Sequence, residues 1–293
     1  MTTSSAQCHA TPGQLIPLHY HYQMLMDCTR MQGFRDAISH LLPEGGKAVD
    51  LGGGTGVLSF FIARKASRAW CVEIDAELAA TAQKLLEINN CSGQVEVVHA
   101  DATTFVPPEP VDLVVCEMLH SALLREKQIQ VINAFKQNYL AHFPGKLPAF
   151  IPEATFLAVQ AVQQDFNFNG YLAPVPILLN PQLDQSSTTQ LSEPVVYSLL
   201  QYHQEISEKV SWKGTLAISA DGNLNALRFI TKNVLAIQLE KNSTIDWHNF
   251  YLVLPLPETL TVKAGSQLNL EFSYTTGAEI SDLSSSISYQ YQL

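Results

Sequence analysis

Two glutamates, nine positions apart, are the side chains of this sequence that most directly suggest chemistry. Glu117 ends an apolar run at residues 111–116, and Glu126 follows after a short segment. Two nearby carboxylates suit a planar cation such as a guanidinium, because its fork of N–H donors matches paired oxygens. Such a clamp could also concentrate electron density on the remaining nitrogen of the guanidinium. Alternatively, Glu117 only marks a strand end and Glu126 is a solvated helix acid.

A glycine-dense turn earlier in the chain offers a place for a ligand. An apolar run at 47–51 leads into this turn, which contains Gly52, Gly54 and Gly56. Glycine permits positive φ and lets a ligand lie against bare main chain. The helix expected at 57–66 would add unpaired N–H groups at its first turn. The dinucleotide fingerprint would place its third glycine one position after Gly56, so the spacing disfavours a dinucleotide.

The pattern that begins at Asp50 is D-x-G-x-G-x-G, which resembles the first motif of class I S-adenosylmethionine-dependent methyltransferases. An apolar run at 69–72 reads as a second strand and ends in Glu73, whose carboxylate suits the two hydroxyls of a ribose. A third strand precedes Asp101 and Ala102, where a carboxylate and neighbouring backbone groups could meet an adenine. The alternative for Asp101 is a plain turn aspartate.

The elements that must position these residues follow from the spacing of apolar side chains. Apolar residues three and four apart predict helices at 18–42 and 75–89. Strands that alternate with helices imply a parallel sheet, in which ligands bind at the carboxyl ends of the strands. After residue 150, short apolar segments recur between turn signals, which indicates an all-β barrel or sandwich. The strands we expect are 47–51, 69–73, 95–99, 111–116, 155–162, 252–254, 259–262, 268–274 and 287–291.

The predicted fold class is therefore α/β, a Rossmann-like class I methyltransferase domain followed by an all-β, barrel-like domain. Residues 165–190 are rich in Asn, Pro, Gln and Ser and read as an irregular excursion within the second domain. The expected divisions are a flexible tail at 1–14, a helical lid at 15–46, an S-adenosylmethionine-binding domain at 47–150 and a β domain for substrate and dimerisation at 151–293.

Composition narrows the class of protein further. The 293 residues are 46% hydrophobic, enough for a large core, and the net charge of −10 argues against nucleic-acid binding, which needs Lys and Arg. Five scattered cysteines form no C-x-x-C pair, so we expect neither a disulfide framework nor a zinc site. We expect a cytoplasmic protein that does not bind membranes, because no apolar run approaches the length of a membrane span.

Several stretches together resemble protein arginine methyltransferases, and the likeness extends over nearly the whole chain from residue 21. The stretch His21-x-x-Met24-Leu25-x-Asp27-x-x-Arg30 resembles the N-terminal helix motif of that family, and Glu117 and Glu126 match its double-glutamate loop. Residues 150–155 resemble the crossing into its β domain. The sequence Asp246-Trp247-His248-Asn249 lies where that family usually has Thr-His-Trp-x-Gln.

The resemblance implies methyl transfer from S-adenosylmethionine to a guanidinium nitrogen, with no metal. The residues it implies for the acceptor clamp are Glu117 and Glu126. Those implied for cofactor binding are Met24, Arg30, Asp50, Gly52, Gly54, Gly56, Glu73, Asp101 and Ala102, with Arg30 on the cofactor carboxylate. Those implied for substrate binding are His21, Asp27, Met118, Asp246, Trp247 and His248. A homodimer formed through an arm at 165–190 is also implied.

The sequence departs from that family on the substrate side. An aromatic stretch expected before His21 is missing, and Met118-Leu119-His120 replaces Trp-Met-Gly. Asp246 replaces the family histidine and is expected to face Asp27 or its neighbours; His248, two positions on, would share its face of the strand. These departures keep two alternatives to peptidyl arginine open: a small guanidino or amino metabolite as acceptor, or a non-catalytic, methyltransferase-like binding subunit.

Overall fold

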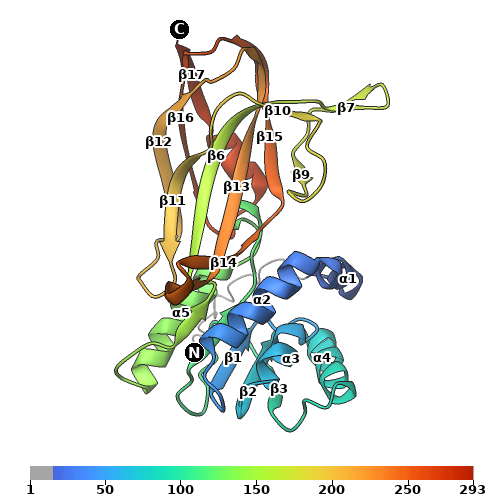
Figure 1. The fold of residues 1–293 in the computed structure, drawn as a ribbon, viewed down its shortest axis with the longest axis vertical. Coiled ribbons are helices and arrows are strands. Elements are labelled where there is room, and N and C mark those ends of the chain that lie inside the picture. Colours follow the sequence, from blue (N-terminus) through green and yellow to red (C-terminus); the bar gives the residue numbers. More distant parts are fainter. Residues whose placement is uncertain (1–15, 293) are drawn as a thin grey trace, which may run out of the picture.

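The computed structural model describes residues 16–292, so the tail expected at 1–14 lies outside the described residues. Two halves stack along the long axis of the molecule (Figure 1). Helices and a parallel sheet form one half, and antiparallel strands form the other. The chain passes between the halves from strand β5 (Ala149–Ile151) to strand β6 (Ala154–Gln164), which is where the sequence predicts the crossing.

The predicted N-terminal helical segment is confirmed, but it is two helices rather than one. Helix α1 (Leu18–Met26) ends at Asp27, and α2 (Cys28–Leu41) begins immediately after it. Asp27 has a non-helical ψ of 89°, and its carboxylate accepts a hydrogen bond from the backbone N–H of Arg30. This is an N-cap, and short polar side chains are favoured at that position. Helix α2 packs into the core, whereas α1 contributes no buried side chain.

The parallel sheet has the strand order β3-β2-β1-β4-β5. The chain moves outward from β1 to β3 and then returns to the other side of β1, so the strand order reverses between β1 and β4. Ligands bind at the carboxyl ends of strands beside such a reversal. The elements of this half are β1 (Lys47–Leu51), α3 (Val57–Ala63), β2 (Arg68–Glu73), α4 (Ala76–Ile88), β3 (Val95–His99), β4 (Leu113–Cys116) and α5 (Gln128–His142).

The C-terminal half consists mainly of antiparallel strands, as the sequence predicts, and besides the two-stranded β7–β8 hairpin they form two larger sheets rather than one closed barrel. An isolated bridge between Ser192 and Ile218 joins them. The sheets enclose an aromatic core in which Phe272 packs against Tyr197 and Phe229, with ring centroids 5.0 and 5.4 Å apart. The strands are β11 (Val195–Gln201), β12 (Lys209–Ala217), β13 (Gly222–Gln238), β14 (Ser243–His248), β15 (Tyr251–Val262), β16 (Gln267–Thr275) and β17 (Ser288–Gln292).

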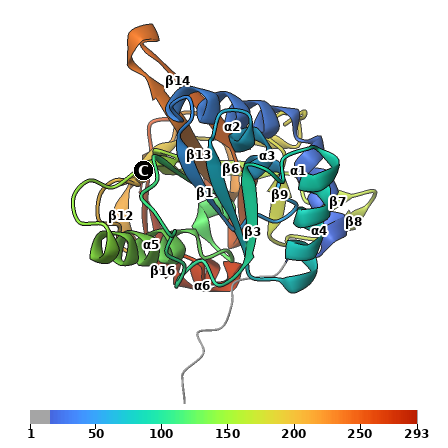
Figure 2. The ribbon, with the colours of Figure 1, turned by 90° about the horizontal axis from the view of Figure 1, so that it is seen from below.

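Two features of this half were not anticipated in detail. The excursion at 165–190 contains four short strands, β7 (Asn167–Phe168), β8 (Tyr171–Leu172), β9 (Ile177–Leu179) and β10 (Thr188–Gln190). The β7–β8 hairpin projects from the molecule, and so does the turn between β13 and β14 when the molecule is seen from below (Figures 1 and 2). Helix α6 (Ile280–Ser286) interrupts the β pattern, and a capping box between Glu279 and Asp282 starts it.

Candidate active site

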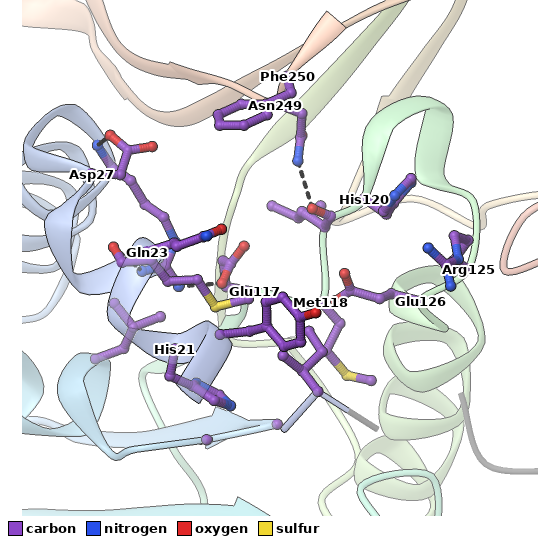
Figure 3. Close-up of a pocket in the computed structure, with 18 of the residues that line it drawn as sticks. His21, Gln23, Asp27, Glu117, Met118, His120, Arg125, Glu126, Asn249 and Phe250 are labelled. Carbon is purple, nitrogen blue, oxygen red and sulfur yellow. Dashed lines mark hydrogen bonds and ion pairs between the residues drawn. The ribbon is translucent and has the colours of Figure 1, made fainter. Parts of the chain in front are cut away.

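A cavity of about 1390 Å³ lies at the carboxyl ends of the parallel strands, where the two halves of the molecule meet. Helix α1, the turn after β1, the loop after β4 and the turn after β14 supply most of its wall (Figure 3). The strand reversal explains this placement, because it brings the ends of β1 and β4 to either side of one crevice.

The glycine turn approaches neighbouring side chains so closely that a Cβ would not fit. Gly52 and Gly54 have φ of 76° and 55°, which L side chains rarely adopt. A Cβ on Gly54 would lie 2.8 Å from Cε1 of His21, and one on Gly52 would lie 3.0 Å from Cγ and Sδ of Met118. The backbone of the turn therefore lies directly against the side chains of His21 and Met118, both of which are labelled in Figure 3.

Glu73 anchors the glycine turn. Its Oε2 accepts a hydrogen bond from the N–H of Gly54 at 2.8 Å, and its Oε1 accepts one from the N–H of Asp75 at 2.9 Å. The carboxylate is buried at the edge of the cavity. Each carboxylate oxygen has a further lone pair, so Glu73 can also accept from two ligand hydroxyls.

Among the other residues predicted for the cofactor, Asp101 and Ala102 line the same end of the cavity. Asp101 accepts hydrogen bonds from the backbone and the hydroxyl of Thr103. Asp50 lies beneath the turn instead, where its carboxylate accepts from the Ser59 hydroxyl at 2.7 Å. Burial raises the pKa of Asp50 to about 6. Asp50 and Gly56 are not part of the cavity lining, so their contribution is to the shape of the turn.

Arg30 reaches the centre of the cavity from α2. Its Nη2 forms an ion pair with Oε2 of Glu117, and its Nη1 donates to the carbonyl of Met24 at 3.5 Å. Nε of Arg30 and Nε2 of His21 are buried without a hydrogen-bond partner among the described residues. These two orphaned groups border the same space, and an unpaired buried polar group is costly unless a ligand meets it.

Glu117 and Glu126 point into the cavity from the two ends of one loop, with Met118 beside them (Figure 3). Burial, together with the negative charge of Glu117, raises the pKa of Glu126 to about 8. Both influences disfavour a second negative charge. A bound cation would reverse them, so the loop is electrostatically suited to a positively charged ligand.

The turn after β14 corrects one prediction from the sequence. Asp246 does not face Asp27; its carboxylate pairs with Lys232 at 2.7 Å. The indole Nε1 of Trp247 donates to Asp27 instead, at 3.1 Å. Alternate residues of a strand point to opposite faces, so Asp246 and His248 share the face away from the cavity, and neither lines it.

Sequence reasoning also missed two parts of the cavity wall. The first part is Asn249 and Phe250, which line the cavity where the sequence predicted Asp246 and His248. The alternation of strand faces, counted from Trp247 rather than Asp246, would have indicated Asn249. The second part is the segment 178–185 of the excursion, in which Gln182 donates to Asp27 at 3.5 Å. No pattern in the sequence indicates this contact.

The residues present fit S-adenosylmethionine. The glycine turn, Glu73 and Arg30 line the same cavity, and Nε of Arg30 is buried there without a hydrogen-bond partner among the described residues. Within residues 16–292, no group of three side chains of the metal-ligating types lies close enough to hold a metal ion. In the same part of the chain, no helix combines the length and apolar character that crossing a membrane requires.

Comparison with known proteins indicates a methyltransferase. A family model described as a methyltransferase domain matches residues 48–138. An uncharacterised protein of Methanothermobacter thermautotrophicus is 30% identical over 270 residues, which cover 92% of this chain and 97% of that protein. A probable protein arginine N-methyltransferase 6.1 of Oryza sativa subsp. indica is 28% identical over 152 residues, covering 51% of this chain and 39% of that protein.

Among solved structures, the Trypanosoma brucei PRMT1 enzyme–prozyme heterotetrameric complex with AdoHcy has a similar fold. The TM-score is 0.72 at 16% sequence identity, and the match covers 94% of this chain and 97% of the other. At this identity the likeness concerns the fold. The match extends over both halves, so the arrangement of parallel and antiparallel sheets is shared.

Proposed function

We propose that this chain, which belongs to the class I S-adenosylmethionine-dependent methyltransferases similar to protein arginine methyltransferases, methylates a guanidinium nitrogen. Peptidyl arginine is the first candidate acceptor. One observation carries the proposal: Glu117 and Glu126 point into a single cavity that the glycine turn and Glu73 also line.

The cofactor, S-adenosylmethionine, supplies a methyl group on a positively charged sulfur. Glu73 would accept from its ribose hydroxyls, Asp101 from its adenine amino group, and Arg30 would meet its carboxylate. Gly52 and Gly54 add no side chain of their own, so the glycine turn, with Met118 and His21 against it, would lie beside the main body of the cofactor. Helices α1 and α2, at 15–46 in our division of the chain, would act as a lid over it.

The acceptor would be held by the two glutamates. Glu117 and Glu126 would each accept N–H donors of the guanidinium and so orient the nitrogen that forms the new N–C bond as the C–S bond breaks. In-line positioning and the local electric field would supply most of the rate gain. The acceptor nitrogen loses one proton in the reaction, and Glu126 can take it up as the carboxylate, the form that a bound guanidinium favours by offsetting the charge of Glu117.

A panel of acceptors tests the proposal. Purified protein is incubated with S-adenosylmethionine together with arginine-rich peptides and free guanidino compounds, and the products are identified by mass spectrometry. We expect a mass gain of one methyl group on a peptidyl arginine, and Glu117→Gln should remove it. Transfer to no guanidino compound, with the cofactor bound, would contradict the guanidinium assignment.

A small guanidino or amino metabolite is the second candidate acceptor. The observation that favours it is that segment 178–185 of the same chain forms a further wall of the cavity and reaches Asp27 through Gln182. A wall at this side limits the space around an acceptor. In the panel, methylation of a free guanidino compound without methylation of any peptide would select this reading.

We also propose that residues 151–293 serve substrate binding and dimerisation, and that 165–190 is the dimerisation arm. Strand β8 of the β7–β8 hairpin is apolar and accessible, with Tyr171 and Leu172 74% and 70% exposed. Apolar side chains gathered on a projecting hairpin are typical of an interaction surface. A second copy of this chain is the partner expected from the likeness to arginine methyltransferases.

A further inference from the structure

The loop that carries both glutamates has an unusual backbone. Ala122, Leu123 and Arg125 have φ of 56°, 56° and 63°, in the left-handed region that residues with a Cβ seldom occupy. A residue in this region persists only where the surrounding structure holds it. The loop conformation therefore depends on contacts outside the loop.

Those contacts come largely from the antiparallel half. The N–H of Ala122 donates to the Thr231 hydroxyl at 2.7 Å, and the Tyr274 hydroxyl donates to the Ala122 carbonyl at 2.9 Å. Backbone hydrogen bonds of 2.8 Å add two more links, from Gly277 N–H to the Leu123 carbonyl and from Arg125 N–H to the Ala278 carbonyl.

Among these contacts from the antiparallel half, that of Asn249 lies nearest in sequence to Glu117. Its Nδ2 donates to the Leu119 carbonyl at 2.5 Å, two residues after Glu117 (Figure 3). Its Oδ1 accepts from Nδ2 of Asn233 at 2.9 Å, and Asn233 in turn accepts from the Thr155 hydroxyl at 2.9 Å. Asn249 is only 5% exposed. Because both ends of its buried amide are engaged, the side chain has one orientation.

We propose that Asn249 is a positioning residue for the acceptor site, which fixes the first half of the 117–126 loop and thereby the separation of the two glutamate carboxylates. The inference rests on the proposed function in that it assigns those glutamates to the acceptor. The buried chain from Thr155 through Asn233 to Asn249 makes the antiparallel half a structural part of the acceptor site.

The exchange Asn249→Asp is the sharpest test, because it removes the donor to Leu119 while the shape and the acceptor for Asn233 remain. Asn225→Asp is the matched control. Asn225 lies on β13, and both ends of its amide are also engaged, here by the N–H and the carbonyl of Gln164 at 2.8 and 2.9 Å. It does not line the cavity. Asn233→Asp is a second variant, because it removes the donor that fixes the amide of Asn249.

The first readout needs no acceptor: hydrogen exchange measured by mass spectrometry on peptides that cover 117–126. In Asn249→Asp and Asn233→Asp we expect exchange there to be about tenfold faster, since one of the bonds closing the loop is lost. Peptides covering the glycine turn should be unchanged, and Asn225→Asp should leave the loop as in the wild type. Unchanged loop exchange in both test variants, or equal acceleration in the control, would overturn the proposal.

The second readout is methyl transfer to whichever compound of the acceptor panel reacts. We expect kcat to fall about tenfold or more in Asn249→Asp, because small misplacement of reacting groups is costly, while the Kd for S-adenosylmethionine stays within about twofold. Asn225→Asp should keep the wild-type kcat even where its Tm falls as much as that of Asn249→Asp. If no panel compound reacts but loop exchange accelerates, the proposed function fails and the positioning role stands. A wild-type kcat in Asn249→Asp would refute the positioning role alone.

Discussion

Arg30 and Glu117 form an ion pair between helix α2 and the end of strand β4, and their side chains are only 7% and 11% exposed. Removing one member of a buried pair leaves the other charge uncompensated, which is usually more damaging than losing the pair. The pair joins a residue proposed for the cofactor to one proposed for the acceptor. The cofactor side and the acceptor side of the site are therefore joined by this ion pair, so a test substitution at either residue should keep the size and shape of the side chain.

Glu117→Gln should abolish methyl transfer while the affinity for S-adenosylmethionine stays near the wild-type value. The amide oxygen can still accept from Arg30, but the charge that would hold a guanidinium is gone. Isothermal titration gives the affinity, and mass spectrometry gives the turnover. Glu240→Gln, an exposed residue away from the cavity, is the control and should behave as the wild type. Turnover that survives in Glu117→Gln would exclude the clamp.

Glu126→Gln should make the protein more stable relative to the wild type as pH rises. The pKa of Glu126 is raised from 4.5 to about 8 in the folded state, so between these values the folded chain binds more protons than the unfolded chain. The wild type consequently loses stability with rising pH across this window, and the glutamine variant does not share that loss. The measurement is Tm of both proteins at pH 5, 7 and 9.

The control for this pH series is Glu44→Gln, at an exposed position outside the cavity. Its Tm difference from the wild type should not grow with pH. A constant difference for Glu126→Gln would mean that burial does not raise the pKa of Glu126 in the folded protein.

Glu73→Ala should weaken binding of S-adenosylmethionine by about 1–3 kcal/mol, the usual cost of leaving buried hydroxyls unmatched. Some of the loss would come from the glycine turn, because Glu73 also accepts from the N–H of Gly54. Titration calorimetry measures the change. Glu96→Ala removes a glutamate from the neighbouring strand, where the side chain is 56% exposed, and should leave the affinity unchanged. Equal affinity in both variants would remove Glu73 from the site.

Tyr171→Asp combined with Leu172→Asp should convert a dimer to a monomer in size-exclusion chromatography with light scattering. Aspartates at an apolar contact would be costly to bury, and their charges would repel the facing surface. Leu239→Asp is the control, because Leu239 is 87% exposed on the separate turn between β13 and β14. If the wild type is a monomer at micromolar concentration, the arm proposal is wrong.

The cofactor side of the site could be predicted from the sequence because its residues are close in the chain and lie on regular elements. Strand β1 ends at Leu51 as predicted, and the turn that follows needs glycine for reasons of backbone geometry alone. The order of strands and helices then places the ends of β1 and β4 together. The sequence predicted that the C-terminal half consists of β-strands but not how its sheets are arranged, because strands of open and closed sheets show the same alternation of side chains.

The acceptor side could be predicted less well, because it depends on register and on distant contacts. A shift of one residue on β14 exchanges the faces of a strand, and this put Asp246 rather than Trp247 opposite Asp27. The approach of Gln182 to Asp27 joins residues 155 positions apart without any local pattern. The break between α1 and α2 could be predicted only in part, because Asp27 is a good N-cap but the apolar spacing continues through it.

The left-handed residues of the 117–126 loop limit how this protein can be recombined with its relatives. Ala122 is held by Thr231 and Tyr274, 109 and 152 positions away in sequence. A chimera that joins residues 16–150 to the β half of another protein would therefore inherit a cofactor pocket without an ordered acceptor loop. In evolution or in engineering, the two halves therefore have to be exchanged together.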